Sequence, residues 1–346
     1  MVFLMSGVRD IAYDVLLQRH RLTSRQVNLL LGERVLAEDV NGKLADLETL
    51  DEFIRVADAF NAAGMVFIPL KGPVLSYRLY GDATTRYYRD LDILVEWHQA
   101  GMADEILSGL GYAACSPPWP AEKKHQQRLM KHTNQLSYEH ISTHRIIELH
   151  WRLLDVTPVS NRRLEEIIRC NTMPFSFAGR SFTVLSDEME LLYLVIHGGL
   201  HFFRRLKWLV DADLFLRTRE IDRDRFTALA CELKASRLIA LFKAIQSIYF
   251  PGHTTIPCSS LPIRYMVTLS KRKIGSTGDD EHDTIRGIMQ SLFYRLIAFP
   301  GIRYKVRTVL NFMFVPEYYD HRRFSGFPPL FYAYCMLLLA VNRAKR

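Results

Sequence analysis

The chain has 346 residues, of which 49% are hydrophobic and 24% are charged, as in an ordinary globular protein of one or two domains. Its five cysteines are scattered and form no Cys-x-x-Cys pair, which argues against a disulfide framework or a zinc ribbon and predicts a cytoplasmic protein. The first apolar run, in MVFLMSGVRD, is too short for a signal peptide. The last one, Leu330–Val341, is too short to span a bilayer, although its basic flanks would suit a membrane surface.

The net charge of +8 comes from the C-terminal part of the chain. Residues 261–346 contain 14 Lys and Arg against 6 Asp and Glu, whereas the preceding 260 residues contain 31 of each kind. A basic region of this size can attract nucleic acid, an anionic membrane or an acidic partner. A basic surface without a partner explains the same charge, so both interpretations stay open.

Hydrophobic periodicity predicts the elements in chain order. Helices are expected at 8–20, 24–38, 47–63 and 98–110, and strands at 65–70, 90–95, 112–115, 135–140 and 145–153. From Ser186 onward the pattern is helical, with two amphipathic helices over 222–250 and a linker-like stretch over 251–285.

The order of these elements predicts an α+β fold, in which a small mixed sheet with flanking helices precedes a larger helical C-terminal region. We divide the chain into an N-terminal helical element (1–44), a catalytic domain (45–155) and a mainly helical region that completes the cleft (156–346).

The most informative stretch covers residues 66–95. Its buried strand ends at Lys71-Gly72, where glycine permits a tight turn against a ligand, and a helix follows. Asp90 and Asp92 alternate with apolar residues, so on a strand the two carboxylates point to one face. Adjacent carboxylates repel each other unless a cation such as Mg²⁺ neutralises them. Asp-x-Asp alone is common at solvated strand edges, but together with the upstream turn it predicts phosphoryl or nucleotidyl transfer.

A second polar face is expected on the strand at 145–153, where Ile146, Glu148 and His150 point the same way. A carboxylate and an imidazole beside an Asp pair suit a metal site, whereas a hairpin face in contact with water is the alternative. His150 also suits orienting a ligand or contacting phosphate.

The segments LKG, LYGDATTR and RDLDILV, taken in order, resemble a polymerase-β-like nucleotidyltransferase branch that is uncharacterised and found near polysaccharide and peptide-tailoring genes. The wider superfamily usually has Gly-Ser at the turn, and Lys71-Gly72 departs from it as this branch does. HRIIELHWRL matches the strand of the family's third carboxylate, and HGGLHFFRRLKWLVDAD matches its helical region with paired histidines. The resemblance covers about residues 50–215 and implies the fold and the metal site rather than the substrate.

The resemblance implies that Asp90, Asp92 and Glu148 are catalytic and bind Mg²⁺ or Mn²⁺, with Glu148 on a second metal or acting as base. His197 and His201 have a zinc spacing, but the Glu of the metalloprotease motif is absent, so a polar, partly buried helix face is preferred. The residues expected to hold the donor or to balance its charge are Lys71, Gly72, Arg86, Arg89, His150, His201, Arg205, Lys207 and Asp211.

The predicted activity is magnesium-dependent transfer of a nucleoside monophosphate from a nucleoside triphosphate to an acceptor hydroxyl. One alternative keeps the fold and uses a nucleotide-sugar, transferring the sugar to a peptide, saccharide or other small acceptor. Another alternative, from a different class, is a non-catalytic binding module for RNA or an acidic partner. The sequence names neither the donor nor the acceptor.

Overall fold

The computed structural model describes residues 11–34, 36–37, 39–115, 117–250, 260–276 and 285–313. Its helices are η2 (Val15–Arg19), α1 (Ser24–Leu31), α2 (Val40–Ala62), α3 (Gly72–Tyr80), η3 (Trp97–Gln99), α4 (Ala100–Gly109), α5 (Lys123–His132), α6 (Asn161–Cys170), α7 (Asp187–Leu200), α8 (Leu206–Thr218), α9 (Arg223–Glu232), α10 (Ser236–Tyr249), α11 (Leu261–Gly275), α12 (Ile285–Ala298) and α13 (Ile302–Met313). Its strands are β1 (Phe67–Pro69), β2 (Asp90–Val95), β3 (Tyr112–Ala114), β4 (Gln135–His140), β5 (Ile146–His150), β6 (Thr172–Phe177) and β7 (Arg180–Leu185).

The main sheet has five strands in the order β1-β2-β5-β4-β3. Strands β2 and β5 run parallel to each other, and the remaining neighbours are antiparallel. The predicted α+β fold with a mixed sheet and flanking helices is therefore confirmed. The parallel pair places the two polar strand faces next to each other in the middle of the sheet.

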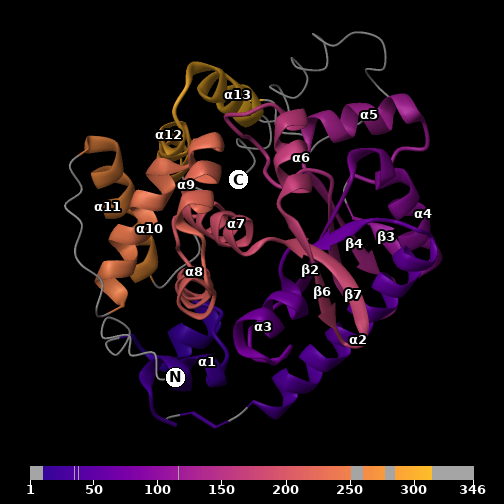
Figure 1. The fold of residues 1–346 in the computed structure, drawn as a ribbon, viewed down its shortest axis with the longest axis horizontal. Helices are drawn as coiled ribbons and strands as arrows, with labels where there is room; N and C mark the ends of the chain where they lie inside the picture. Colours follow the sequence, from indigo (N-terminus) through magenta and orange to yellow (C-terminus); the bar gives the residue numbers. More distant parts are fainter. Residues whose placement is uncertain are drawn as a thin grey trace.

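The two faces of the sheet belong to different cores. Leu91 and Ile93 of β2 point into a core that they share with Phe53 and Phe60 of α2 and with Leu107 of α4. On the other face, Leu94 joins the core of the helical region, in which α7 and α8 lie. Figure 1 shows helices α7 to α13 gathered on one side of the molecule and the sheet with α2 and α4 on the other. The face that carries Asp90 and Asp92 is thus turned toward the helical region.

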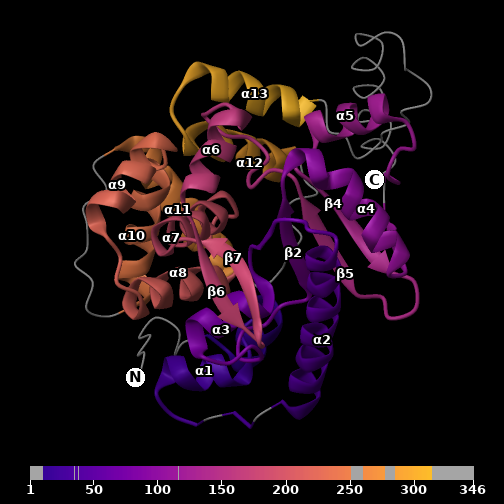
Figure 2. The same ribbon diagram turned by 45° about the vertical axis from the view of Figure 1, so that its right-hand side comes forward.

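A two-stranded hairpin, β6–β7, and the preceding helix α6 were not predicted. Phe182 of β7 stacks on Phe53 of α2 with ring centroids 5.5 Å apart, so the hairpin packs into the core beneath the sheet. In Figure 2 the hairpin is seen beside the sheet, and β7 contacts both β1 and α7. The segment from residue 156 therefore contributes strands as well as helices, and the domain boundaries stay predictions.

Two predicted helices differ by several residues from their bounds in the structure. The helix expected over 24–38 ends at Leu31, because Gly32 adopts a left-handed backbone with φ of 72°. The helix expected from residue 47 begins earlier, at Val40. The segment 251–285, within which a linker-like stretch was predicted, contains the regular helix α11.

Several other predicted segments lie outside the described residues. They are the first part of the helix predicted over 8–20, the stretches 251–259 and 277–284, and the apolar run Leu330–Val341. Within the described residues, no helix combines the length and the apolarity needed to cross a membrane.

The single helix face predicted through residues 197–211 is interrupted. Helix α7 ends at Leu200 and α8 begins at Leu206, because Phe202 and Phe203 take left-handed φ angles of 62° and 48°. A Cβ atom on Gly198 would overlap the Phe203 ring, so the glycine makes room for the returning chain. The Gly-Gly pair therefore lies where the chain packs closely against itself, just before the break.

Candidate active site

A cavity of about 450 Å³ lies between the polar face of β2 and β5 and the helices α7 and α8. Ten of the predicted site residues line it: Lys71, Gly72, Arg86, Asp90, Asp92, Glu148, His150, His201, Arg205 and Lys207. Two predicted residues are outside this lining. Arg89 is exposed at the surface, and Asp211 is fully buried behind the wall.

The turn between β1 and α3 forms one end of the cavity. Gly72 has φ of 64°, a backbone conformation that other residues rarely adopt, and it starts α3 directly after the strand. No side chain caps the N-terminus of α3. The first backbone N–H groups of the helix therefore have no hydrogen bond to a capping side chain, and they lie beside the cavity. A helix terminus of this kind favours an anionic ligand such as phosphate.

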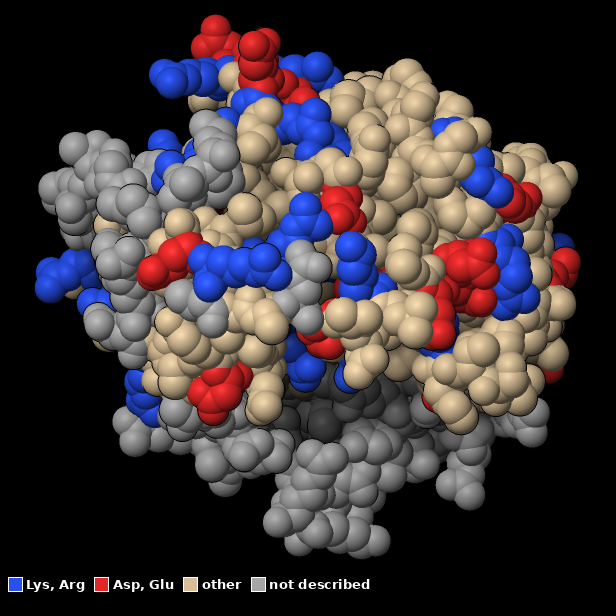
Figure 3. Space-filling view, turned by 90° about the horizontal axis from the view of Figure 1, so that it is seen from below, with Lys and Arg blue, Asp and Glu red and all other residues tan. Residues whose placement is uncertain are grey.

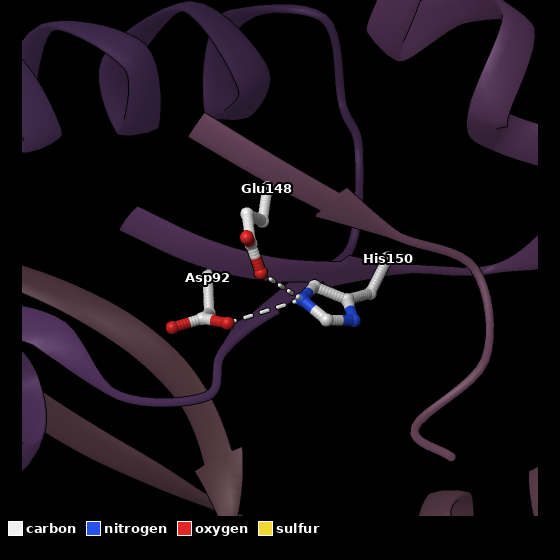
Figure 4. Close-up of side chains that lie close together, drawn as sticks. All are labelled: Asp92, Glu148 and His150. Atoms are coloured by element: carbon white, nitrogen blue, oxygen red, sulfur yellow. Dashed lines mark hydrogen bonds and ion pairs between the residues drawn. The ribbon is translucent and has the colours of Figure 1, made fainter. Parts of the chain in front are cut away.

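Asp92, Glu148 and His150 form a compact group on β2 and β5 (Figure 4). Asp92 and Glu148 are register partners on the parallel strands, and His150 Nε2 lies 3.1 Å from Asp92 Oδ1 and 3.7 Å from Glu148 Oε2. The three potential ligand atoms lie within 4.8 Å of one another, and Gln135 donates a hydrogen bond of 2.6 Å to Glu148. Among the described residues, these three side chains are the ones placed closely enough to bind one metal ion together.

The grouping differs from the predicted Asp90–Asp92 pair. Residues two apart on a strand are separated by about 6.6 Å, whereas neighbouring strands are about 4.8 Å apart, so a cross-strand partner comes closer than the second residue along. The structure therefore joins Asp92 to Glu148 and His150, while Asp90 lines the same cavity without belonging to this group. A metal-binding role for Asp90 stays a prediction.

The charges of the site are strongly coupled around Asp92. Burial opposes its ionisation, but Lys71, whose Nζ lies 3.0 Å from Asp92 Oδ1, and His150 hold the pKa of Asp92 well below its usual value. The same contacts act in the other direction on the partners: against the effect of burial, Asp92 raises the pKa of both Lys71 and His150. Burial and the charge of Asp92 raise the pKa of Asp90. Asp92 is thus ionised and Asp90 resists ionisation.

Comparison with known proteins identifies the family of this chain. Over residues 20–250 the sequence matches the family described as "Uncharacterised nucleotidyltransferase". The chain belongs to this family. The resemblance found in the sequence is thereby confirmed, and the protein is a transferase enzyme of the nucleotidyltransferase class.

One solved structure found to be similar is the solution structure of the antibiotic-resistance factor ANT(2'')-Ia, with a TM-score of 0.38 and 13% sequence identity. The similarity covers 57% of this chain and 96% of that chain. No curated protein matches the sequence.

In this nucleotidyltransferase, Arg86 and Asp211 form a buried ion pair at the edge of the cavity. Arg86 Nε lies 3.0 Å from both carboxylate oxygens of Asp211, and the two side chains are 2% and 0% exposed. Lys207, one turn before Asp211 on α8, has its pKa lowered to about 7 by burial and by the charge of Arg86. Asp211 therefore fixes a neighbouring cation, Arg86, from behind the cavity wall.

Several cavity residues were missed by the sequence reasoning, among them Tyr193, Gln135 and Arg295. Tyr193 lies one helical turn before His197, so the helical spacing that selected the histidines includes it. Gln135 is two strand positions from Ser137, the register partner of Glu148, and only the strand pairing shows that it faces the site. Arg295 comes from α12, and no local pattern connects it with the sheet.

Proposed function

We propose that this enzyme transfers a nucleoside monophosphate from a nucleoside triphosphate to an acceptor hydroxyl, with a divalent cation, in the cavity described above. The observation that carries the proposal is the Asp92–Glu148–His150 group beside the uncapped N-terminus of α3. One part offers ligands for a cation and the other offers N–H groups for phosphate, and nucleotidyl transfer needs both.

The residues present fit a divalent cation. Asp92 and Glu148 offer the carboxylate oxygens that Mg²⁺ and Mn²⁺ prefer, and a third carboxylate, Asp90, lines the same cavity. A bound cation would stabilise negative charge on the attacking and leaving oxygens. His150, whose Nε2 lies 3.1 Å from Asp92 Oδ1, suits orienting the Asp92 carboxylate.

The protein's own groups then have separate roles. The N–H groups at the start of α3, together with Lys71, hold the triphosphate, and Lys207 adds a positive charge from α8. Glu148, oriented by Gln135, accepts the proton of the acceptor hydroxyl. Arg86 acts on the phosphates from the edge of the cavity while Asp211 fixes its guanidinium. Arg89 remains a candidate for the leaving pyrophosphate from the exposed side.

The first test is calorimetric titration with ATP, GTP, CTP, UTP and UDP-glucose, each with Mg²⁺ and with EDTA. The wild type is compared with Asp92→Asn and with Asp51→Asn, which changes an exposed carboxylate on α2 away from the cavity. We expect at least one nucleoside triphosphate to bind only with Mg²⁺. We expect Asp92→Asn to abolish this binding and nearly all turnover, and Asp51→Asn to leave both unchanged.

Two results would decide against the proposal. Nucleotide binding that survives both EDTA and Asp92→Asn would refute the metal assignment. Binding of UDP-glucose alone, with the mass of a hexose added to an acceptor, would establish the glycosyl-transfer alternative. The predicted cytoplasmic location, tailoring role and acceptor class stay predictions, as do the nucleic-acid and membrane partners.

A further inference from the structure

We infer that the second wall of the cavity, formed by His201 and Trp208 with His197 and Tyr193 behind them, is the subsite that holds the base of the nucleotide donor. The inference rests on the proposed function. It assigns to this aromatic wall the part of the donor that extends away from the phosphates.

The wall is a continuous set of rings that spans the break between α7 and α8. The ring centroids of His201 and Trp208 are 5.1 Å apart at an interplanar angle of 35°, and those of His197 and His201 are 4.8 Å apart. Tyr193 extends the set along α7, with its centroid 5.8 Å from that of His197. All four side chains line the cavity that contains Asp92. Aromatic surfaces of this kind bind nucleobases by stacking.

The electrostatics of the wall suit an uncharged base. Burial, followed by the charge of Arg295, lowers the pKa of His201 to about 3. Burial, followed by the charge of Lys71, lowers the pKa of His197 well below its usual value. Both imidazoles are therefore neutral at pH 7. On Trp208, the guanidinium of Arg205 lies 5.6 Å from the ring centroid, so the ring is already held by a cation–π contact.

The position of the wall favours the donor over the acceptor. Lys71 and the aromatic side chains line the same cavity, so a nucleotide whose phosphates bind beside Lys71 can place its base against the wall. Glu148, the proposed base for the acceptor hydroxyl, is held instead by Gln135 of β4. Of the two substrates, the donor always carries an aromatic base, and we therefore assign the wall to the donor.

The inference can be tested by comparing a nucleotide with a ligand that lacks a base. The probes are the tightest-binding nucleoside triphosphate from the titrations above and inorganic tripolyphosphate, each with Mg²⁺. The variants are Trp208→Leu and His201→Leu, their aromatic counterparts Trp208→Phe and His201→Phe, and the control Trp97→Leu. Trp97 lies on η3 after β2 and does not belong to the cavity lining.

We expect each Leu variant to bind the nucleotide about tenfold more weakly, because a stacked base contributes of that order to affinity. Tripolyphosphate binding should not change, and each Phe variant should recover most of the nucleotide affinity. Trp97→Leu should behave as the wild type. His201 is only partly buried, so its variants provide the test even if Trp208→Leu fails to fold.

The inference is overturned if both Leu variants keep wild-type nucleotide affinity, or if they lose tripolyphosphate affinity to the same extent as nucleotide affinity. If the wild type binds the nucleotide with Mg²⁺ and Asp92→Asn does not, but the Leu variants of the aromatic wall bind it as the wild type does, only this inference is contradicted. A wild type that binds no nucleotide would contradict the proposed function itself.

Discussion

Lys207 is the residue at which the cavity should respond to pH near neutrality. Its side chain is buried on α8, and burial with the charge of Arg86 lowers its pKa to about 7, from an ordinary value near 10.5. The lysine therefore carries its charge below pH 7 and loses it above. Phosphate prefers the charged form, so nucleotide binding should raise the pKa of Lys207 and take up a proton above pH 7.

We predict that the Kd of the magnesium nucleotide rises as the pH is increased from about 6.5 to about 8.5. The size of the rise depends on how far binding raises the pKa of Lys207, with each pKa unit changing the Kd by up to about tenfold. Lys207→Arg keeps its charge throughout this range, so its Kd should change less, while Lys207→Met should bind weakly at every pH. Titration of the three proteins across the range measures the effect, and the ionisation of the triphosphate itself cancels in their ratios. An equal pH dependence in Lys207→Arg and the wild type would remove Lys207 from the phosphate site.

At the residue scale, local periodicity was sufficient to predict which faces meet in the site but not which atoms do. Alternation along one strand placed Asp90 and Asp92 on one face, and alternation along another placed Glu148 with His150. The closer contact of Asp92 with Glu148 follows from the parallel register of β2 and β5, which no local pattern encodes. The buried pairing of Arg86 with Asp211 joins residues 125 positions apart and was equally inaccessible.

At the scale of elements, the prediction failed where a pattern continued across a break. The spacing of one continuous helix is kept by residues 197, 201, 204, 208 and 211. In the structure α7 stops at Leu200 and a second helix, α8, begins at Leu206. The hairpin β6–β7 was missed for a related reason. Its strands alternate weakly between buried and exposed residues and include Pro174, which is unfavourable in most strand positions.

The break between α7 and α8 provides a prediction about Gly198. In Gly198→Ala the new methyl group would overlap the ring of the fully buried Phe203, and overpacking of this kind costs about 1–3 kcal/mol. We expect a lower free energy of unfolding, together with weaker nucleotide binding because His201 and Trp208 flank the break. Chemical denaturation and calorimetry measure the two effects.

Gly101→Ala is the matched control, since Gly101 is also helical but has no atom within 4 Å of the position of a Cβ. This variant should be as stable as the wild type or slightly more stable, because alanine favours a helix. Replacing Phe203 by Leu in the Gly198→Ala background should recover part of the loss. If Gly198→Ala is as stable as Gly101→Ala, the glycine is not required for the packing of this corner.

At the scale of the whole molecule, the net positive charge comes from the described helices α11 to α13. Figure 3 shows a face on which basic and acidic side chains are interspersed rather than separated into patches of one sign. Within 261–346, the described residues 261–276 and 285–313 contain nine Lys and Arg and no Asp or Glu. Contact of this basic region with RNA, a membrane or an acidic partner stays a prediction.

Two buried arginines connect the sheet side of the molecule to the helical side. Arg78 of α3 bonds to Glu190 of α7 at 3.0 Å, and Arg86, in the loop before β2, bonds to Asp211 of α8. The cavity lies between the two sides that these pairs connect. Their geometry therefore sets how far the carboxylates stand from the aromatic wall.

We predict that breaking the Arg86–Asp211 pair destabilises the whole molecule. Asp211→Ala should lower the free energy of unfolding by about 3–5 kcal/mol, because it leaves the Arg86 guanidinium buried without a counter-charge. In Arg86→Met/Asp211→Ala both charges are absent, so the loss should be smaller than the sum of the two single losses. Asp58→Ala is the control, since Asp58 and Arg180 also join distant segments but do so at the exposed surface, where an ion pair contributes little. Denaturant unfolding of Asp211→Ala, Arg86→Met, the double variant and Asp58→Ala gives the coupling energy. Additive losses in the double variant would show that the pair does not connect the two sides. A loss for Asp211→Ala no larger than that for Asp58→Ala would show the same.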